Sequence, residues 1–142
     1  MTTTTPGPVV IGLGCSSRAE AAEIIALVQS CLVRAGVAPS QVVAVATHAR
    51  RRLSPALLQT ASRFGLTLRY LDDDQLAPGV PGTSEAVAAA AGPLLLPMRK
   101  SAFATCAIAL AGEGFEAERF GQPVSPRATR ASSTLATSLA GS

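Results

Sequence analysis

Short apolar runs alternate along the chain with segments in which apolar residues recur at helical spacing. An apolar run of about four to eight residues, bounded by turn residues, is typical of a buried strand. Glycine, proline and polar residues bound the runs here, so each has a place to start and to stop. We therefore expect strands at residues 9–13, 42–46, 66–71, 93–97 and 103–110.

Three of the segments between these runs are predicted to be helices. In the first, Ile24, Val28 and Leu32 fall on one face at the spacing of an amphipathic helix. Serine is a common N-cap residue, proline suits the first turn of a helix, and glycine favours the left-handed conformation that ends one. The expected start and stop signals are Ser17 with Glu20 and Gly36, Ser54 with Pro55 and Gly65, and Ser84 with Glu85 and Gly92.

This alternation predicts an α/β fold. Strand–helix–strand units imply parallel neighbours with helices on both faces of the sheet, whereas the short loop between the last two runs implies an antiparallel pair. We expect a single three-layer domain with a mixed, mostly parallel sheet of about five strands. From Gly112 the composition shifts to small and polar residues. The expected organisation is a flexible N-terminus at 1–8, a domain at 9–120 and a flexible tail at 121–142.

The amino-acid composition narrows the classes of molecule that the protein could bind. The chain has 12 Lys and Arg against 9 Asp and Glu, and its aromatic content is 4%. This mild positive charge favours anionic ligands, but the scarcity of aromatic residues gives little for nucleic-acid bases to stack on. The three cysteines are widely spaced and suggest neither a disulfide framework nor a metal site. With no leader-like or membrane-spanning run, we expect a cytoplasmic protein without nucleic-acid, membrane or metal partners.

Two predicted loops carry the candidate chemistry. In open α/β sheets, ligands bind beyond the carboxyl ends of the parallel strands. Residues 12–18, with the sequence GLGCSSR, and residues 47–52, with the sequence THARRR, each follow such a strand directly. The backbone N–H groups of the first loop and the arginines of the second predict a site for an anion.

Several interpretations of these residues remain open. Cys15, Thr47 and His48 are candidate catalytic groups, but each is also consistent with a structural role. The segment GLGCSSR resembles the start of a dinucleotide fingerprint, although Ser17 replaces its third glycine. The acidic run 72–74 offers possible metal ligands, yet a solvated turn with Asp74 as a cap explains it more simply.

Four blocks of the sequence carry a family resemblance, namely VVIGLGCSSRAEAAEI, VAVATHARRRLSPALLQTASRFGLTLRYLDDDQL, GTSEAVAAAAG and LLLPMRKSAFATCAIAL. In this order they resemble the CobE proteins of cobalamin biosynthesis and the C-terminal domain of CbiG. The matching positions include Thr47, Pro55, Glu85, Lys100 and Thr105. Three family residues differ, because Ala49, Arg51 and Met98 stand where an acidic residue and two lysines are usual.

The resemblance implies a role in building the corrin ring, where CbiG-type proteins open the lactone of a cobalt-precorrin and release a two-carbon fragment. Precorrins are macrocycles rimmed with carboxylates, so a protein that holds one needs several separated cations and N–H donors around an apolar floor. The expected ligand-binding residues are Gly12, Gly14, Cys15, Ser16, Ser17, Arg18, Thr47, His48, Arg50, Arg51, Arg52, Ser84, Glu85, Arg99 and Lys100.

We therefore expect a protein that binds a precorrin-type tetrapyrrole as a carrier or assisting factor, without a cofactor of its own. Other enzymes of the cobalamin pathway and a second copy of the chain are possible partners. Two alternatives remain at this stage. One is a CbiG-like precorrin lactone hydrolase, and the other is an NADP-binding reductase component in which the arginines receive a 2′-phosphate.

Overall fold

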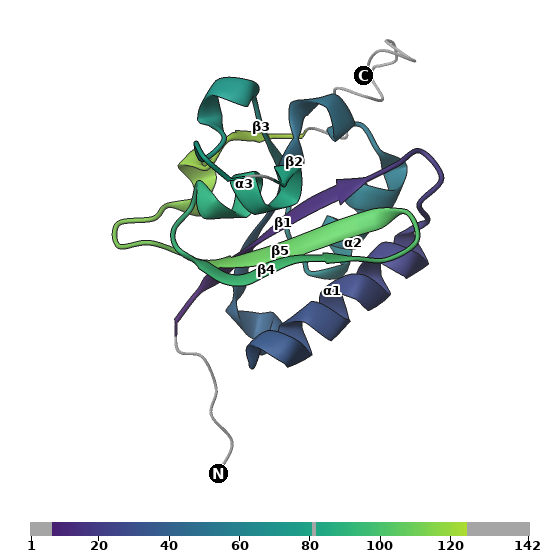
Figure 1. The fold of residues 1–142 in the computed structure, drawn as a ribbon, viewed down its shortest axis with the longest axis horizontal. Helices are drawn as coiled ribbons and strands as arrows, with labels where there is room; N and C mark the ends of the chain where they lie inside the picture. Colours follow the sequence, from purple (N-terminus) through teal and green to yellow (C-terminus); the bar gives the residue numbers. More distant parts are fainter. Residues whose placement is uncertain (1–6, 81, 125–142) are drawn as a thin grey trace, which may run out of the picture.

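The computed structural model describes residues 7–80 and 82–124 of the 142-residue chain. In this part of the chain a six-stranded sheet has the order β4-β5-β1-β2-β3-β6 (Figure 1). The strands are β1 (Val9–Cys15), β2 (Val42–His48), β3 (Leu68–Leu71), β4 (Leu94–Lys100), β5 (Ala104–Leu110) and β6 (Gln122–Pro123). The helices are α1 (Ala21–Ala35), α2 (Pro55–Arg63) and α3 (Thr83–Ala89), with short 3-10 turns η1 (Pro39–Gln41), η2 (Ala49–Arg51), η3 (Asp73–Gln75) and η4 (Ala117–Arg119).

The α/β class and the mixed sheet are confirmed, but the expectation of a mostly parallel sheet needs correction. Strand β1 pairs in parallel with β2, and β2 with β3. The pairs β1–β5, β4–β5 and β3–β6 are all antiparallel. The hairpin of β4 and β5 returns along β1, and β6 adds an antiparallel edge that was not expected.

Helices cover both faces of the sheet, which makes the three expected layers. Helices α1 and α2 pack on one face, where Ile24 and Leu57 join a cluster with Val9, Ile11 and Leu13. Helix α3 covers the other face, where Val87 packs against Val10 and the small residues of β2. The alternation of side chains along β1 therefore divides its residues between two cores.

The helix boundaries confirm some of the predicted caps and correct others. Ser54 caps α2 by accepting a hydrogen bond from the N–H of Leu57, and Gly36 ends α1 with a left-handed φ of 70°. The capping box at Ser17 is wrong, because α1 starts later, after Glu20 as its N-cap. Helix α3 ends at Ala89, before the predicted stop at Gly92. Asp72, not Asp74, precedes the 3-10 turn η3.

The described structure continues past residue 120, where we expected the domain to end. Arg69 of β3 is buried and donates hydrogen bonds to the backbone carbonyls of Glu118, Phe120 and Gly121. Strand β6 then pairs with β3, and Val124 is only 3% exposed. Residues 1–6 of the predicted N-terminal segment and residues 125–142 of the predicted tail lie outside the described residues.

No helix within residues 7–80 and 82–124 combines the length and the apolar character needed to cross a membrane.

Candidate functional site

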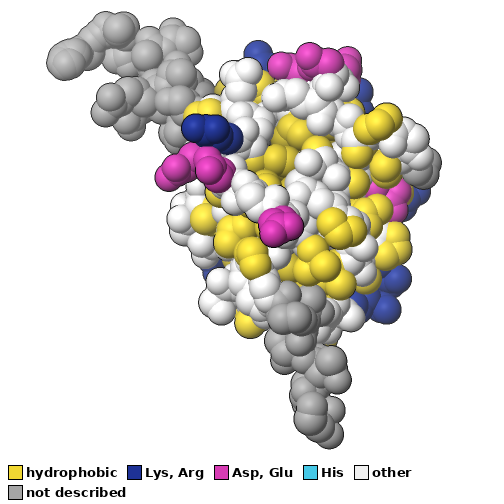
Figure 2. Space-filling model, turned by 90° about the vertical axis from the view of Figure 1, so that its left-hand side faces the viewer, with side chains coloured by type: hydrophobic (Ala, Val, Ile, Leu, Met, Phe, Trp, Pro, Cys, Tyr) yellow, Lys and Arg dark blue, Asp and Glu magenta, His cyan; other side chains and the backbone are white. Residues whose placement is uncertain are grey.

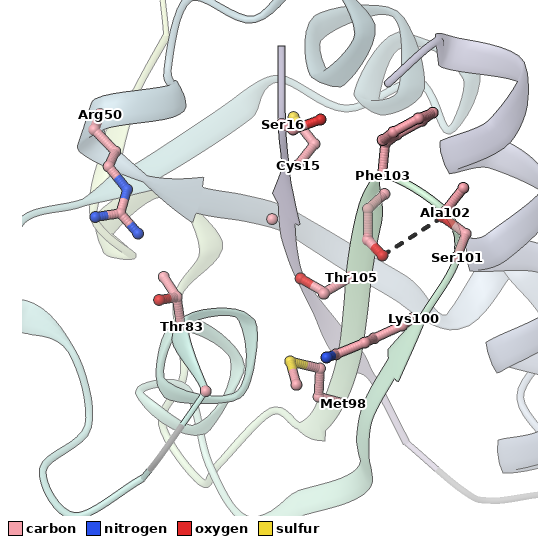
Figure 3. A pocket seen from close by; sticks show the side chains of 13 residues that line it. Cys15, Ser16, Arg50, Thr83, Met98, Lys100, Ser101, Ala102, Phe103 and Thr105 are labelled. Atoms are coloured by element: carbon pink, nitrogen blue, oxygen red, sulfur yellow. Dashed lines mark hydrogen bonds between the residues drawn. The ribbon is translucent and has the colours of Figure 1, made fainter. Parts of the chain in front are cut away.

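An open cleft of about 510 Å³ lies beside the carboxyl end of β1, on the face of the sheet that α3 covers. Its floor includes Gly14 of β1 and Thr105 of β5, which are register partners across the β1–β5 pair. The start of α3 supplies one wall, and β4 with the β4–β5 turn supplies another (Figure 3). The lining residues are Gly14, Cys15, Ser16, Arg50, Gly82, Thr83, Met98, Lys100, Ser101, Ala102, Phe103, Ala104 and Thr105.

The β4–β5 turn is held in place from both sides. Glu23 of α1 accepts hydrogen bonds from the Ser101 hydroxyl and, at 2.7 Å, from the N–H of Phe103. The Phe103 carbonyl accepts from the N–H of Ser16 at 2.9 Å, and the Arg18 guanidinium lies 5.3 Å from the centre of the Phe103 ring. These contacts tie the turn to the β1–α1 loop, so the wall of the cleft is built before any ligand arrives.

Two cations face the cleft from opposite sides. Figure 3 shows the Arg50 guanidinium reaching in from η2 and the Lys100 ammonium group reaching in from β4. Within residues 7–80 and 82–124, neither side chain makes a hydrogen bond or an ion pair. Arg52 differs, because it donates to the Ala49 carbonyl and stacks on Tyr70. The charges of Arg50 and Lys100 therefore remain available for an anion.

His48 has both ring nitrogens engaged at the end of β2. Its Nδ1 accepts a hydrogen bond from the N–H of Arg50 at 3.1 Å, and its Nε2 lies 2.6 Å from Oδ1 of Asp73. A neutral imidazole satisfies both contacts with the proton on Nε2. His48 does not line the cleft. Its geometry suits a residue that shapes the arginine turn η2.

Three of the predicted site residues are fully buried in the sheet and α3. The Thr47 hydroxyl donates to the Leu13 carbonyl at 2.8 Å. Gly12 lies under α3, and a Cβ built at this glycine would be 2.2 Å from the Ser84 carbonyl oxygen. Ser84 itself is 0% exposed, and its hydroxyl has no hydrogen-bond partner among the described residues. The structure thus places all three in the packing behind the cleft.

The remaining predicted residues lie around the cleft in different roles. Glu85 accepts a hydrogen bond from the N–H of Met98 at 2.8 Å and so joins α3 to β4. Arg99 is exposed on β4 and does not line the cleft. Ser17 and Arg51 line a second, adjoining cavity instead. Asp73 of the acidic run pairs with His48. No three His, Cys, Asp or Glu residues gather in a metal-binding group within the two described ranges.

The cysteines have different environments. Cys15 is partly exposed, and its Sγ lies 3.7 Å from the Ser54 Oγ. Cys31 and Cys106 are buried between α1 and β5. The hydrogen bond between these two thiols, together with burial, holds the pKa of Cys106 well above its ordinary value. Only Cys15 therefore presents a thiol to a ligand.

From α3 and the β4–β5 hairpin, the sequence reasoning predicted Lys100 but missed most of the other residues that line the cleft. Among the residues not predicted, Thr83, Met98, Ser101, Phe103 and Thr105 all line it. The sequence contained part of the information, because it predicted that the last two strands form an antiparallel pair. If β5 is known to lie antiparallel beside β1, the turn between β4 and β5 must lie at the carboxyl end of β1. Sequence alone did not establish that neighbour.

The far side of the molecule has a different surface. Figure 2 shows the left-hand side of Figure 1, away from the carboxyl end of β1. Apolar side chains lie between acidic ones there, and basic side chains lie mainly toward the margins. The small cavity formed by Gly114, Phe115, Glu116, Arg119 and Phe120 contains the ion pair of Arg119 with Glu116. Its arginine is thus already paired, whereas Arg50 and Lys100 in the cleft have no such partner within residues 7–80 and 82–124.

The fold and the site together define an α/β domain with a cleft whose two cations have no ion-pair partner in the part of the chain that the structure describes. The family model of the cobalamin synthesis G C-terminus matches residues 9–109. Because this match covers more than half of the chain, the protein belongs to that family. The resemblance to the CobE proteins and the CbiG C-terminal domain is thereby confirmed.

Individual relatives agree with this assignment. Protein CobE of Sinorhizobium sp is 39% identical over 71 residues, which are 50% of this chain and 46% of that protein. The match therefore spans about half the length of this curated relative. A cobalamin biosynthesis protein chiG from Agrobacterium tumefaciens str. C58 has a TM-score of 0.63 at 26% identity, over 74% of this chain and 99% of that one.

A solved structure of CobE, a protein from the cobalamin (vitamin B12) biosynthetic pathway, is similar in fold. Its TM-score is 0.65 at 23% identity, over 76% of this chain and 93% of that chain.

Proposed function

We propose that this protein acts in cobalamin biosynthesis by binding a precorrin-type tetrapyrrole in the cleft, as a carrier or assisting factor. The observation that carries the proposal is the open cleft with Arg50 and Lys100 on two opposite sides, neither of which has an ion-pair or hydrogen-bond partner for its charged group among the described residues. The family of the chain supports the pathway. The geometry of the cleft supports the class of ligand.

The lining suits a flat molecule with an acidic rim. Met98, Phe103 and Ala104 give the cleft apolar surface, and Ser16, Thr83 and Ser101 give it hydroxyl donors. A polycarboxylate macrocycle would place its ring system on the apolar surface and its carboxylates toward Arg50 and Lys100. Charge-assisted hydrogen bonds of this kind are stronger than neutral ones. Because the cleft is open to solvent, such a ligand can extend beyond the protein.

The positions of the candidate catalytic groups favour binding over catalysis. A general base must reach the group that it deprotonates. His48 has both nitrogens engaged and lies outside the cleft lining, and Thr47 is buried behind it. Cys15 lines the cleft, but its nearest polar side-chain partner is the Ser54 hydroxyl, which is not a base. Cys15 is the residue on which the lactone hydrolase alternative would depend.

The test is a titration of the purified protein with uroporphyrin I, a soluble porphyrin with eight carboxylates, followed by absorbance and fluorescence. We expect saturable binding that weakens at least tenfold in Lys100→Glu, because one attraction is lost and one repulsion is added. Arg63→Glu is the matched control, since Arg63 is exposed on α2 away from the cleft. Equal affinity in the parent and Lys100→Glu would contradict the proposal.

The same experiment separates the two alternatives. Saturable binding of NADPH without binding of any tetrapyrrole would support the reductase component. Conversion of a lactone-bearing cobalt-precorrin by the parent but not by Cys15→Ala, measured by mass spectrometry, would support the hydrolase. We expect neither result.

A further inference from the structure

A second cavity of about 350 Å³ adjoins the cleft. Cys15, Ser16 and Arg50 line both spaces, so the two meet at the carboxyl end of β1 and the arginine turn. The second cavity extends from there between the β1–α1 loop and the start of α2. Its other lining residues are Ser17, Ala19, Arg51, Leu53, Ser54, Pro55 and Ala56.

This cavity has a strongly one-sided charge. Two arginines line it, and none of its lining residues is acidic. Within the described ranges, the guanidinium groups of Arg50 and Arg51 make no hydrogen bond, ion pair or ring contact. The neighbouring Arg52 has both a carbonyl and a ring as partners. Of the three arginines at 50–52, the two that line the cavity are thus the ones without a side-chain partner among the described residues.

The backbone around the cavity is already fixed, which leaves its polar groups ready for a ligand. His48 accepts the N–H of Arg50, and Arg52 donates to the Ala49 carbonyl, so η2 is held at both ends. The Ser16 hydroxyl oxygen accepts the N–H of Arg18 at 3.2 Å. Since that contact uses a lone pair of the oxygen, the hydroxyl proton stays available for donation.

We infer that the second cavity is a carboxylate subsite, which receives one peripheral carboxylate chain of the tetrapyrrole whose ring occupies the cleft. This inference rests on the proposed function. The cavity is smaller than the cleft, and Cys15, Ser16 and Arg50 line both spaces. Arg51 would form the terminal, bidentate contact that suits a carboxylate, and Arg50 would lie between ring and chain. The subsite would fix the orientation of the macrocycle.

A substitution of Arg51 tests the subsite without changing the lining of the cleft. Arg51 lines only the second cavity, whereas Lys100 lines only the cleft. In titrations with uroporphyrin I, we expect Arg51→Gln to weaken binding about tenfold or more, since one charge-assisted contact is lost. Arg51→Lys keeps the charge and should recover part of that loss. Arg63→Gln should bind like the parent, and unchanged circular dichroism should show that every variant is folded.

The outcomes distinguish the subsite from the function on which it rests. A parent that binds uroporphyrin I while Arg51→Gln binds it equally well would overturn the subsite and leave the proposed function standing. A parent that binds no tetrapyrrole would overturn both. A loss in Arg51→Gln that Arg51→Lys does not recover at all would also overturn the subsite, because the lost group would then not be acting as a cation.

Discussion

A substitution at Gly12 tests whether this glycine is needed for packing. The sequence suggested that Gly12 binds the ligand, whereas in the structure it lies under α3. A Cβ at this position would lie 2.2 Å from the Ser84 carbonyl oxygen and 2.8 Å from the Ala88 nitrogen. Both atoms belong to helix backbone and cannot rotate away. Overpacking of this kind costs about 3 kcal/mol, of which a lower entropy of the unfolded chain returns up to about 1 kcal/mol. We expect Gly12→Ala to lower the free energy of unfolding by about 2 kcal/mol.

Gly14→Ala is the matched control, since its Cβ would meet only the Thr105 Oγ1, an atom of a side chain, at 2.7 Å. It should cost less than about 1 kcal/mol. The assay is urea denaturation, where a slope of about 2 kcal/mol per molar predicts a midpoint lower by about 1 M for Gly12→Ala. Equal midpoints for the two variants, or a Gly12→Ala protein as stable as the parent, would refute the packing argument.

Three further predictions concern the contacts around the core. Glu23→Ala should lower the free energy of unfolding by about 1.5 kcal/mol, measured by denaturation, with a smaller loss for Glu23→Gln, because Glu23 holds Ser101 and Phe103. Arg69→Met should speed tryptic cleavage after Arg119, since three carbonyls of that segment lose their donor; an unchanged cleavage rate would contradict this. Iodoacetamide should label only Cys15 in the folded protein up to about pH 8.5 and all three cysteines after unfolding, because burial shields Cys31 and the raised pKa of Cys106 keeps its thiol protonated.

Much of the fold could be predicted from local patterns. The start of α2 at Pro55 follows from a serine N-cap with proline in the first turn, and the end of α1 follows from Gly36. The predicted cap at Ser17 is wrong because the loop between β1 and α1 continues to Glu20. The N–H of Ser16 in this loop donates to the Phe103 carbonyl, a contact that no local pattern shows. Strand β6 was not predicted for a similar reason, since its pairing with β3 and the contacts of Arg69 with the preceding segment join parts of the chain that are far apart in the sequence.

The candidate site was predictable where it depends on strand ends and not where it depends on packing between layers. Cys15, Ser16 and Arg50 lie at the rim because β1 and β2 end there. Thr47 lies one residue before the end of β2 and is fully buried. Its hydroxyl donates a hydrogen bond to β1 and does not face the cleft. Lys100 of the hairpin was expected at the site and lines the cleft. Which other side chains of α3 and the hairpin reach this rim depends on the order of strands in the sheet, which sequence spacing does not specify.

The most direct test of the central claim is a map of the bound ligand on the protein. Backbone amide shifts of ¹⁵N-labelled protein should be recorded by nuclear magnetic resonance during a titration with uroporphyrin I. The account predicts the largest shifts at residues 14–17, 50–51, 82–83 and 98–105, with little change around Phe115 and Phe120 on the far side. Shifts centred on that far side, or none anywhere at saturating porphyrin, would contradict it.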